Sequence, residues 1–438
     1  MPRRPTRATY LPSDRKAPGP MAAVPDDRPL DLLVSNARLV DGRAVAIGAR
    51  DGTWAFVDEE HPGRGHDAHA RIDAEGRLVT ETFVNGHMHL DKVFTLDLAG
   101  EAALHAYTSG SMGEAMLSIV ESASAVKKHY DRTWIMPNVR RALDQAVLNG
   151  VLHVQAFVDV DTAAGLEGME SVLAVRDEYA DLVDLQVVAF PQDGLLRDPG
   201  AAELCEEALR LGADVVGGIP WIEATDTDAR AHVDWACGLA RGRGKRVAML
   251  VDDAGDPSLR TTQMLAESMV AHGLHRRGVA CHGRAIGTYP TPSVVRLVEL
   301  ARTAGLGFVS DPHTGPLHLP VRHFVGAGLP VALGQDDIED AYYPFGRHNM
   351  LEVAFLAAHL LQFLAAEDQR VLLDLVTRRA AAVLGIPGHA IETGNPAHLC
   401  IHDSERVVDL LREHARPRWV VRAGRVVAES GTTGKILR

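Results

Sequence analysis

The chain has 438 residues, of which 46% are hydrophobic and 24% are charged, as in ordinary soluble globular enzymes. Its formal net charge of −13 argues against nucleic acid or an anionic membrane as a partner, because both require a dominant basic field. No apolar run has the length of a membrane span, and the start lacks the apolar core of an export signal. Four scattered cysteines suggest no disulfide framework. We therefore expect a cytoplasmic protein whose partner is a small molecule.

Both ends of the chain are predicted to lie outside the main domain. Residues 1–28 are rich in arginine, proline and polar residues, which predicts a disordered tail and leaves Met21 as an alternative start. Short β-type runs broken by turn residues fill residues 29–80, and similar runs occur in residues 386–438. These two segments predict one small β-sandwich domain built from both chain ends, with two unrelated hairpins as the alternative.

Residues 81–385 alternate strand-like apolar runs with segments whose apolar residues recur every three or four positions. Eight runs are predicted strands: Thr82–His89, Leu152–Val160, Leu185–Gln192, Val215–Trp221, Arg246–Asp253, Gly278–Arg284, Gly307–Asp311 and Pro330–Asp337. Helices are expected over Met112–Tyr130, Asn138–Leu148, Ala201–Leu211, Ala229–Arg241, Thr261–Ala271, Ser293–Ala304, Asn349–Leu364 and Asp368–Leu384. Eight βα units predict an α/β fold, a (β/α)₈ TIM barrel that carries the small domain.

Nearly every predicted strand ends in polar or ionisable side chains. They are His87 and His89, Asp159 and Asp161, Gln192, Glu223, Asp252 and Asp253, His282 and Arg284, Asp311 and His313, and Asp336 and Asp337. The active site of a (β/α)₈ barrel lies at the carboxyl ends of its strands. The even distribution around the strands favours a barrel over a doubly wound sheet, which would gather these residues at one crevice.

The His-x-His motif at His87 and His89 is the strongest chemical signal. Residues two apart on a strand point to the same face, so both rings project into the barrel mouth, where one divalent ion can bridge them. Such a motif also arises by chance. Here, however, it ends an apolar run and is matched by two carboxylates after the last strand.

Those carboxylates belong to Asp336 and Asp337. Adjacent strand residues point to opposite sides, so only one faces the lumen directly, and we expect this to be Asp336. An aspartate beside a metal-bound water can ligate the metal and also accept a proton, because the cation lowers the pKa of the water to about 7. The other interpretation of the pair is an N-cap for the segment that follows.

These motifs resemble the amidohydrolase superfamily, and within it the cytosine deaminase family with its triazine-degrading relatives. The resembling segments are Gly86–Lys92, Ala189–Gly194, Val216–Pro220, Gly334–Asp340, Tyr343–Gly346 and Asn349–Leu351, which match in order and spacing. The resemblance implies a metal-dependent hydrolase that attacks a C–N bond of a nitrogen heterocycle through a metal-activated water. Members of this superfamily often associate, so the resemblance also allows a homo-oligomer.

The resemblance also implies which residues would act. His87, His89 and Asp336 would hold one zinc or iron ion. A second metal is not expected, because binuclear members use a carboxylated lysine on strand four and no lysine occurs between Lys128 and Lys245.

The substrate would be handled by other strand ends. Gln192 would bind the carbonyl edge of a pyrimidine-like ring, and Asp337 would contact the leaving or ring nitrogen. His282 would polarise the carbon that is attacked, and Asp336 would accept the proton of the water.

The chain departs from this family at the fifth strand. Leu250 stands where the family has a further histidine ligand, and Asp253 stands in place of a glutamate that shuttles protons to the ring. Three alternatives follow. Three protein ligands and a water satisfy a catalytic zinc. A fourth ligand could instead come from His282 or Asp253. Third, the metal could be lost, leaving a metal-poor pseudoenzyme or a non-hydrolytic accessory protein that binds a small heterocycle.

Other pocket positions differ from the family in the same direction. Phe157 and Trp221 replace polar groups, and a pocket with fewer donors would discriminate against free cytosine. Arg284 at the sixth strand end suits a carboxylate or phosphate on the substrate, with a salt bridge to a nearby aspartate as the alternative. We therefore expect a changed heterocycle as substrate, which would be anionic if Arg284 binds it rather than lying at the surface or in a salt bridge.

Overall fold

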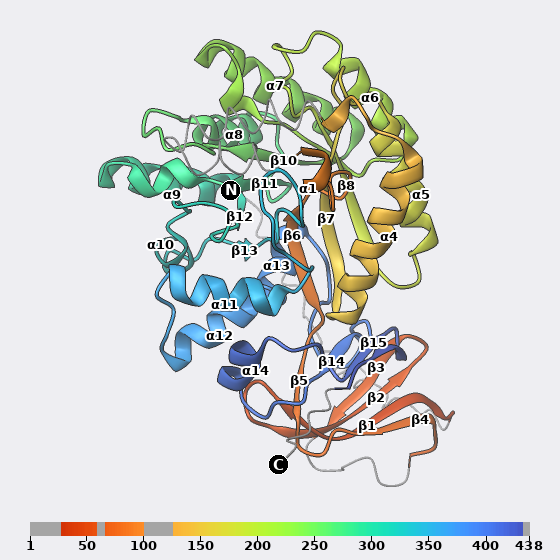
Figure 1. The fold of residues 1–438 in the computed structure, drawn as a ribbon. Coiled ribbons are helices and arrows are strands. Elements are labelled where there is room, and N and C mark those ends of the chain that lie inside the picture. Colours follow the sequence, from red (N-terminus) through yellow and green to blue (C-terminus); the bar gives the residue numbers. More distant parts are fainter. Residues whose placement is uncertain (1–27, 59–65, 100–125, 432–438) are drawn as a thin grey trace, which may run out of the picture.

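The computed structural model describes residues 28–58, 66–99 and 126–431. A barrel surrounded by helices forms one part of the molecule, and a smaller domain with a second sheet lies at one end of it (Figure 1). The predicted tail lies outside the described residues except for Arg28, as does Met21. Among the described helices, none has the length and apolar character needed to cross a membrane.

Eight parallel strands form the barrel. They are β6 (Phe83–Met88), β7 (Val151–Asp159), β8 (Asp184–Phe190), β9 (Val215–Val216), β10 (Arg246–Val251), β11 (Gly278–His282), β12 (Gly307–Ser310) and β13 (Val331–Leu333). Neighbours in the chain pair in order from β6 to β13, and every pair is parallel. An isolated parallel bridge between Met88 and Asp336 joins the first strand to the end of the last. The eight predicted strands and the barrel are therefore confirmed, although the fourth strand is much shorter than predicted: it covers only Val215–Val216, and Pro220–Ile222 form a 3₁₀ helix.

The barrel interior is filled by apolar side chains. Strands contribute Val84, Phe157, Val188, Val215, Ala248, Val279, Val309 and Ala332 to one buried cluster. Their neighbours in sequence, such as Val158, Met249 and Phe308, belong to a second cluster between the strands and the helices. Because both faces of each strand are buried, the strands appear in the sequence as continuous apolar runs. The polar side chains suited to catalysis are therefore found at the strand ends.

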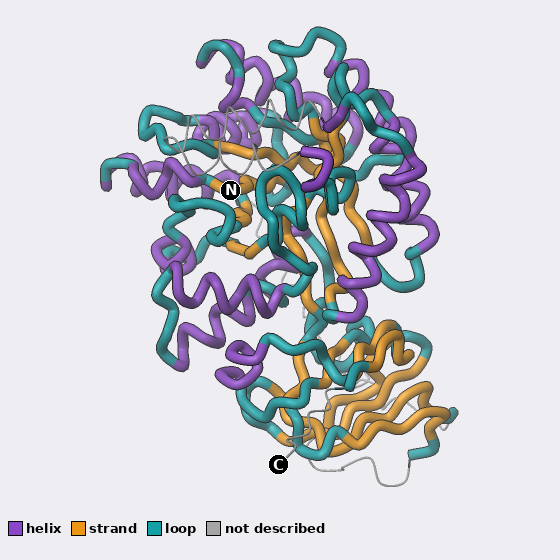
Figure 2. The backbone as a smooth tube through the Cα atoms, in the orientation of Figure 1, coloured by secondary structure: helices purple, strands orange, loops and turns teal. Residues whose placement is uncertain are grey.

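Helices cover the outside of the barrel (Figure 2). They are α4 (Arg132–Leu148), α5 (Glu167–Glu178), α6 (Ala201–Leu211), α7 (Asp226–Arg243), α8 (Thr261–Ala271), α9 (Thr291–Ala304) and α10 (Val321–Gly326). The bounds of α6 and α8 equal the predicted ones, and α5 and α10 had no predicted counterpart. The predicted helix over Met112–Tyr130 lies mostly outside the described residues, which resume after α1 (Leu96–Ala99) at Val126.

The last predicted helix, over Asp368–Leu384, is wrong as a single element. After α11 (Met350–Leu360), the chain forms α12 (Ala366–Asp374) and α13 (Arg378–Leu384). Between them, the carbonyl of Leu375 accepts from Leu333 N and the carbonyl of Val376 accepts from Val84 N, each at 2.9 Å. These hydrogen bonds attach the segment to the barrel strands and compete with continuation of the helix.

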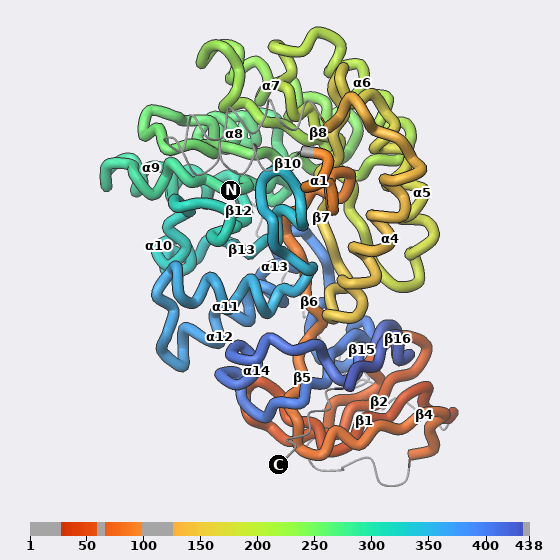
Figure 3. Tube along the Cα trace, in the orientation of Figure 1, coloured from red at the N-terminus to blue at the C-terminus, as the bar shows by residue number. Residues whose placement is uncertain are grey.

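The sheet of the smaller domain also has eight strands and is built from both chain ends. Its strands are β1 (Leu30–Leu39), β2 (Ala44–Arg50), β3 (Thr53–Asp58), β4 (Ala68–Asp73), β5 (Leu78–Thr80), β14 (Leu399–Ile401), β15 (Trp419–Arg422) and β16 (Arg425–Glu429), with α14 (Val407–Glu413) after β14. The antiparallel pair β5 and β14 joins the two ends, which lie side by side as red and blue segments in Figure 3. This arrangement confirms one shared sheet domain rather than two separate hairpins.

Arg422 of β15 attaches the small sheet to the barrel. Its guanidinium binds both carboxylate oxygens of Asp184 on β8, at 2.8 and 3.1 Å, and Nη2 also donates to Ala180 O at 3.1 Å. Arg422 is only 8% exposed, whereas the side chain of Asp184 is 52% exposed, so solvent weakens the ion pair.

We expect Arg422→Met to lower the free energy of unfolding by about 1–2 kcal/mol, because it removes a bidentate charged contact between the two sheets. Urea unfolding followed by circular dichroism measures the change. Arg425→Met, on the exposed start of β16, is the control and should change stability by less than about 0.5 kcal/mol. Equal losses in both variants would contradict the assigned role of Arg422.

Candidate metal centre

His87, His89 and Asp336 meet where the barrel closes. The two histidine rings lie 5.0 Å apart between centroids and are nearly perpendicular. Asp336 Oδ1 lies 3.1 Å from Nε2 of His87 and 3.9 Å from Nε2 of His89. Ligand atoms of a tetrahedral ion at about 2.0–2.2 Å lie about 3.3–3.6 Å from one another. The three side chains therefore match the spacing that one divalent ion requires.

The pKa shifts of His89 and Asp336, and the buried ring nitrogens of His87, also suit a cation. Both ring nitrogens of His87 and Nδ1 of His89 are buried and make no hydrogen bond to any described residue. Burial, with help from the charge of Lys92, lowers the pKa of His89 well below its ordinary value. Burial alone would raise the pKa of Asp336, but His282 and His87 hold it well below the usual range. Neutral imidazoles and an ionised carboxylate are the forms that bind metal.

The backbone at Asp336 corrects one expectation. We predicted that Asp336 and Asp337 would face opposite sides, as on a strand, but β13 ends at Leu333 and Asp336 has a left-handed φ of +65°. Strand alternation therefore does not apply, and both carboxylates line the same pocket. Burial, with Asp336 and Asp340 nearby, raises the pKa of Asp337 well above its ordinary value.

A pocket opens above these residues at the carboxyl ends of the strands. It is lined by His89, Gln192, Ile219, Trp221, Leu250, Asp253, His282, Arg284, Thr314, Asp336, Asp337 and Tyr342. Two of the residues singled out in the sequence are absent from this wall. His87 is fully buried, and Phe157 packs against its ring with centroids 4.4 Å apart. Phe157 thus supports a candidate ligand from the barrel side.

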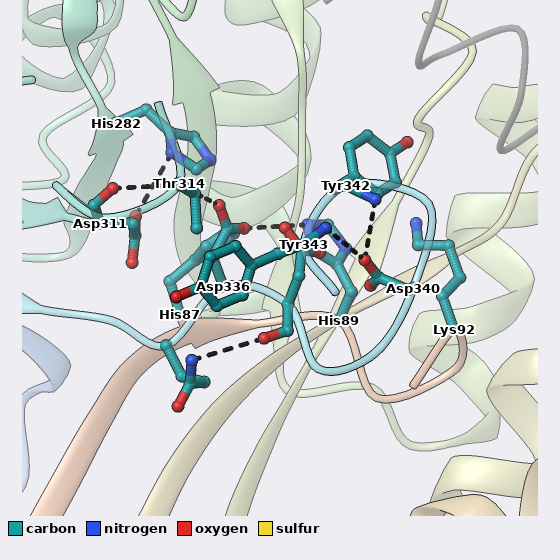
Figure 4. A network of polar contacts seen from close by, with 12 residues as sticks. His87, His89, Lys92, His282, Asp311, Thr314, Asp336, Asp340, Tyr342 and Tyr343 are labelled. Atoms are coloured by element: carbon teal, nitrogen blue, oxygen red, sulfur yellow. Dashed lines mark hydrogen bonds and ion pairs between the residues drawn. The ribbon is translucent and has the colours of Figure 1, made fainter. Parts of the chain in front are cut away.

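Leu250 is an apolar part of the pocket wall and offers no metal-binding atom. A second set of candidate ligands consists of His87, His282 and Asp311, in which Nδ1 of His282 is 3.3 Å from Oδ2 of Asp311. His282, Asp311 and Asp336 lie close together in Figure 4. This set shares His87 with the first, and a neutral imidazole offers one lone pair. The two sets are therefore alternative positions for one ion.

Asp253 and Arg284 form a buried ion pair on the pocket wall. Arg284 Nη1 lies 2.5 Å from Asp253 Oδ1, and His282 Nε2 lies 3.9 Å from Asp253 Oδ2. Burial raises the pKa of Asp253 to about 7, although Arg284 opposes this shift. A carboxyl group with a pKa near 7 can both accept and release a proton at neutral pH. The salt-bridge interpretation of Arg284 matches this geometry.

Lys92 fixes the orientation of Gln192. Its Nζ binds Asp159 Oδ1 at 2.8 Å and donates to Oε1 of Gln192, while Nε2 of Gln192 donates to the hydroxyl of Tyr342. An ammonium group can only donate, so the amide oxygen of Gln192 must face Lys92. The pocket wall at Gln192 therefore presents an N–H donor.

Sequence reasoning did not select Lys92, Thr314 or Tyr342 for the site. Lys92 follows the His-x-His motif, and a lysine at this place in the sequence can pair with any nearby carboxylate. Thr314 and Tyr342 lie in turns beyond β12 and β13, where the sequence has no periodic pattern that indicates which way a side chain points. Asp311 belonged to a strand end that the sequence did mark as polar.

Comparisons with known proteins identify the family to which this chain belongs. The model of the Amidohydrolase family matches residues 70–428. N-isopropylammelide isopropyl amidohydrolase of Pseudomonas sp. (strain ADP) is 27% identical over 91% of this chain and 97% of its own length. Pterin deaminase of Rhizobium rhizogenes is 24% identical over 82% and 83%. The crystal structure of 5-methylcytosine deaminase from Klebsiella pneumoniae, liganded with 5-fluorocytosine, has a TM-score of 0.85 at 30% identity and covers 92% of this chain and 99% of that one. The chain belongs to the amidohydrolase family, as an enzyme that acts on carbon–nitrogen bonds other than peptide bonds.

Proposed function

We propose that this enzyme hydrolyses a C–N bond of a nitrogen heterocycle, in the manner of a deaminase, with a metal-activated water. The observation that carries the proposal is the group of buried ligand atoms on His87, His89 and Asp336 beside the pocket. The relatives named for heterocyclic substrates support the substrate class.

One divalent ion, zinc or iron, is the proposed cofactor. When bound, it would lower the pKa of a water molecule to near neutrality. His87 and His89 would bind through Nε2, the ring nitrogen that faces Asp336 Oδ1 in each case. Asp336 would then serve as the third ligand and as the first acceptor of the water's proton.

Asp253 and His282 would complete the chemistry. Asp253 would pass a proton to a ring or leaving nitrogen, for which its raised pKa of about 7 is suited. His282 is 3% exposed, and its Nε2 is directed toward Asp253 while Nδ1 faces Asp311. It would polarise the carbon that is attacked.

The pocket wall restricts which heterocycles fit. Gln192 would donate to a carbonyl oxygen or an unprotonated ring nitrogen, because Lys92 occupies its acceptor. Asp337 has one buried oxygen without a hydrogen bond and would contact a ring nitrogen. Trp221 and Leu250 supply apolar surface. We assign the charge of Arg284 to balancing Asp253 rather than to binding an anionic substrate, since the two are directly paired.

The second candidate function is a protein that binds a heterocycle without hydrolysing it. Leu250 favours this alternative, because its apolar side chain lines the pocket beside the candidate metal centre and has no atom that could bind a metal ion.

Metal analysis separates these two functions. Protein purified without added metal and then loaded with zinc should contain about one ion per chain, and His87→Ala should lower this content at least about tenfold, because it removes a central ligand. Atomic emission spectroscopy of dialysed protein measures the content. His359→Ala, an exposed histidine of α11, is the control and should keep the metal. If the unaltered enzyme held no more metal than the buffer under any loading condition, the proposal would be refuted.

The pKa of Asp253 gives a second test. Ammonia or amine release from pyrimidines, triazines and pterins should identify a substrate, whose kcat/KM profile should contain an inflection near pH 7. Asp253→Asn should lower kcat by about 10²–10⁴-fold and remove this inflection, because the amide cannot transfer the proton. Asp256→Asn, at an exposed neighbouring position, should leave kcat and the inflection near pH 7 unchanged. An inflection that persists in Asp253→Asn would show that another group titrates.

A further inference from the structure

Thr314 is a buried polar residue that the proposed chemistry does not use. It lies in the turn after β12, lines the pocket and is 4% exposed. Its Oγ1 lies 2.6 Å from Arg284 Nη2, 2.9 Å from Asp336 Oδ2 and 3.0 Å from the carbonyl oxygen of Asp311. One hydroxyl therefore contacts a cation, a candidate metal ligand and a backbone carbonyl, as Figure 4 shows for Thr314 and Asp336.

The chemistry of these partners fixes the direction of the hydrogen bonds. A guanidinium group has no acceptor, so Arg284 must donate to Oγ1 of Thr314. The single hydroxyl hydrogen is then available to Asp336 or to the carbonyl of Asp311. An ionised carboxylate is the stronger acceptor of the two. The hydroxyl therefore donates to Oδ2 of Asp336.

This hydrogen bond gives the two carboxylate oxygens of Asp336 different partners. Oδ2 is engaged by Thr314 and has Arg284 Nη2 at 3.8 Å, whereas Oδ1 faces the two histidines at 3.1 and 3.9 Å. The other arm of Arg284 binds Asp253. A continuous chain of contacts thus runs from Asp253 through Arg284 and Thr314 to Asp336.

We propose that Thr314 is a positioning residue, which holds Asp336 so that only Oδ1 is presented to the metal. Arg284 sets the direction of the Thr314 hydrogen bond. Leu250 supplies no metal ligand from the fifth strand, so the affinity for the ion depends on three ligands. The orientation of each of these three therefore has a larger effect on the affinity than it would in a site with four. This inference rests on the proposed metal centre.

Substitutions at Thr314 separate this role from simple packing. Valine has nearly the shape of threonine and lacks the hydroxyl, whereas serine keeps the hydroxyl and lacks the methyl group. Removing a hydrogen bond to a metal ligand typically lowers metal affinity 10–100-fold. We expect Thr314→Val to raise the Kd for zinc at least about tenfold, and Thr314→Ser to stay within about threefold of the unaltered enzyme.

The Kd is measured by competition between the full-length enzyme and a chromophoric zinc chelator. Circular dichroism of the metal-free proteins checks folding, and Thr314→Ala replaces the valine variant if that variant does not fold. Equal zinc affinity in the unaltered enzyme and Thr314→Val would overturn this inference and leave the proposed function standing. An equal loss in the serine and valine variants would also overturn it, because the methyl group would then be the important part. No zinc binding by the unaltered enzyme would overturn the proposed function itself.

Discussion

The candidate site depends on the two hydrogen bonds that close the barrel. Asp336 N donates to His87 O at 2.9 Å, and His89 N donates to Asp336 O at 3.1 Å, so the last strand end is attached to the backbone of the first. These bonds hold Asp336 beside both histidines although the regular part of β13 has already ended. The three candidate ligands are therefore held together by the closure of the barrel rather than by a flexible loop.

Burial of charge is the second constraint on this site. Asp253, Asp336 and Asp337 are all at most 5% exposed, and unpaired carboxylates at this depth are unstable. Arg284 binds Asp253 directly, and Lys92 binds Asp159 in the adjoining wall. A divalent ion between the histidines would contribute further positive charge beside Asp336. The candidate metal centre thus lies beside cationic side chains of the chain itself.

The sequence predicted the parts of this architecture that depend on regular periodicity. Eight apolar runs indicated the strands. The His-x-His spacing correctly brought His87 and His89 together, although the pairing of β6 with β7 shifts register between Asn85 and Met88 and the strand ends before His89. The orientation of Asp337 could not be predicted, since it follows a left-handed residue beyond the strand. The break before Thr377 was missed because it is caused by hydrogen bonds to β6 and β13, which are distant in the sequence. The contacts of Thr314 depend on the fold in the same way.

The central claim is that a metal ion lies at the barrel closure, between the first and last strands. An anomalous difference map, recorded at the zinc absorption edge from crystals of the zinc-loaded enzyme, tests it most directly. We predict one peak within about 2.0–2.2 Å of Nε2 of His87, Nε2 of His89 and Oδ1 of Asp336. A peak between His282 and Asp311 that has no contact with His89, or no peak in the pocket, would contradict this account.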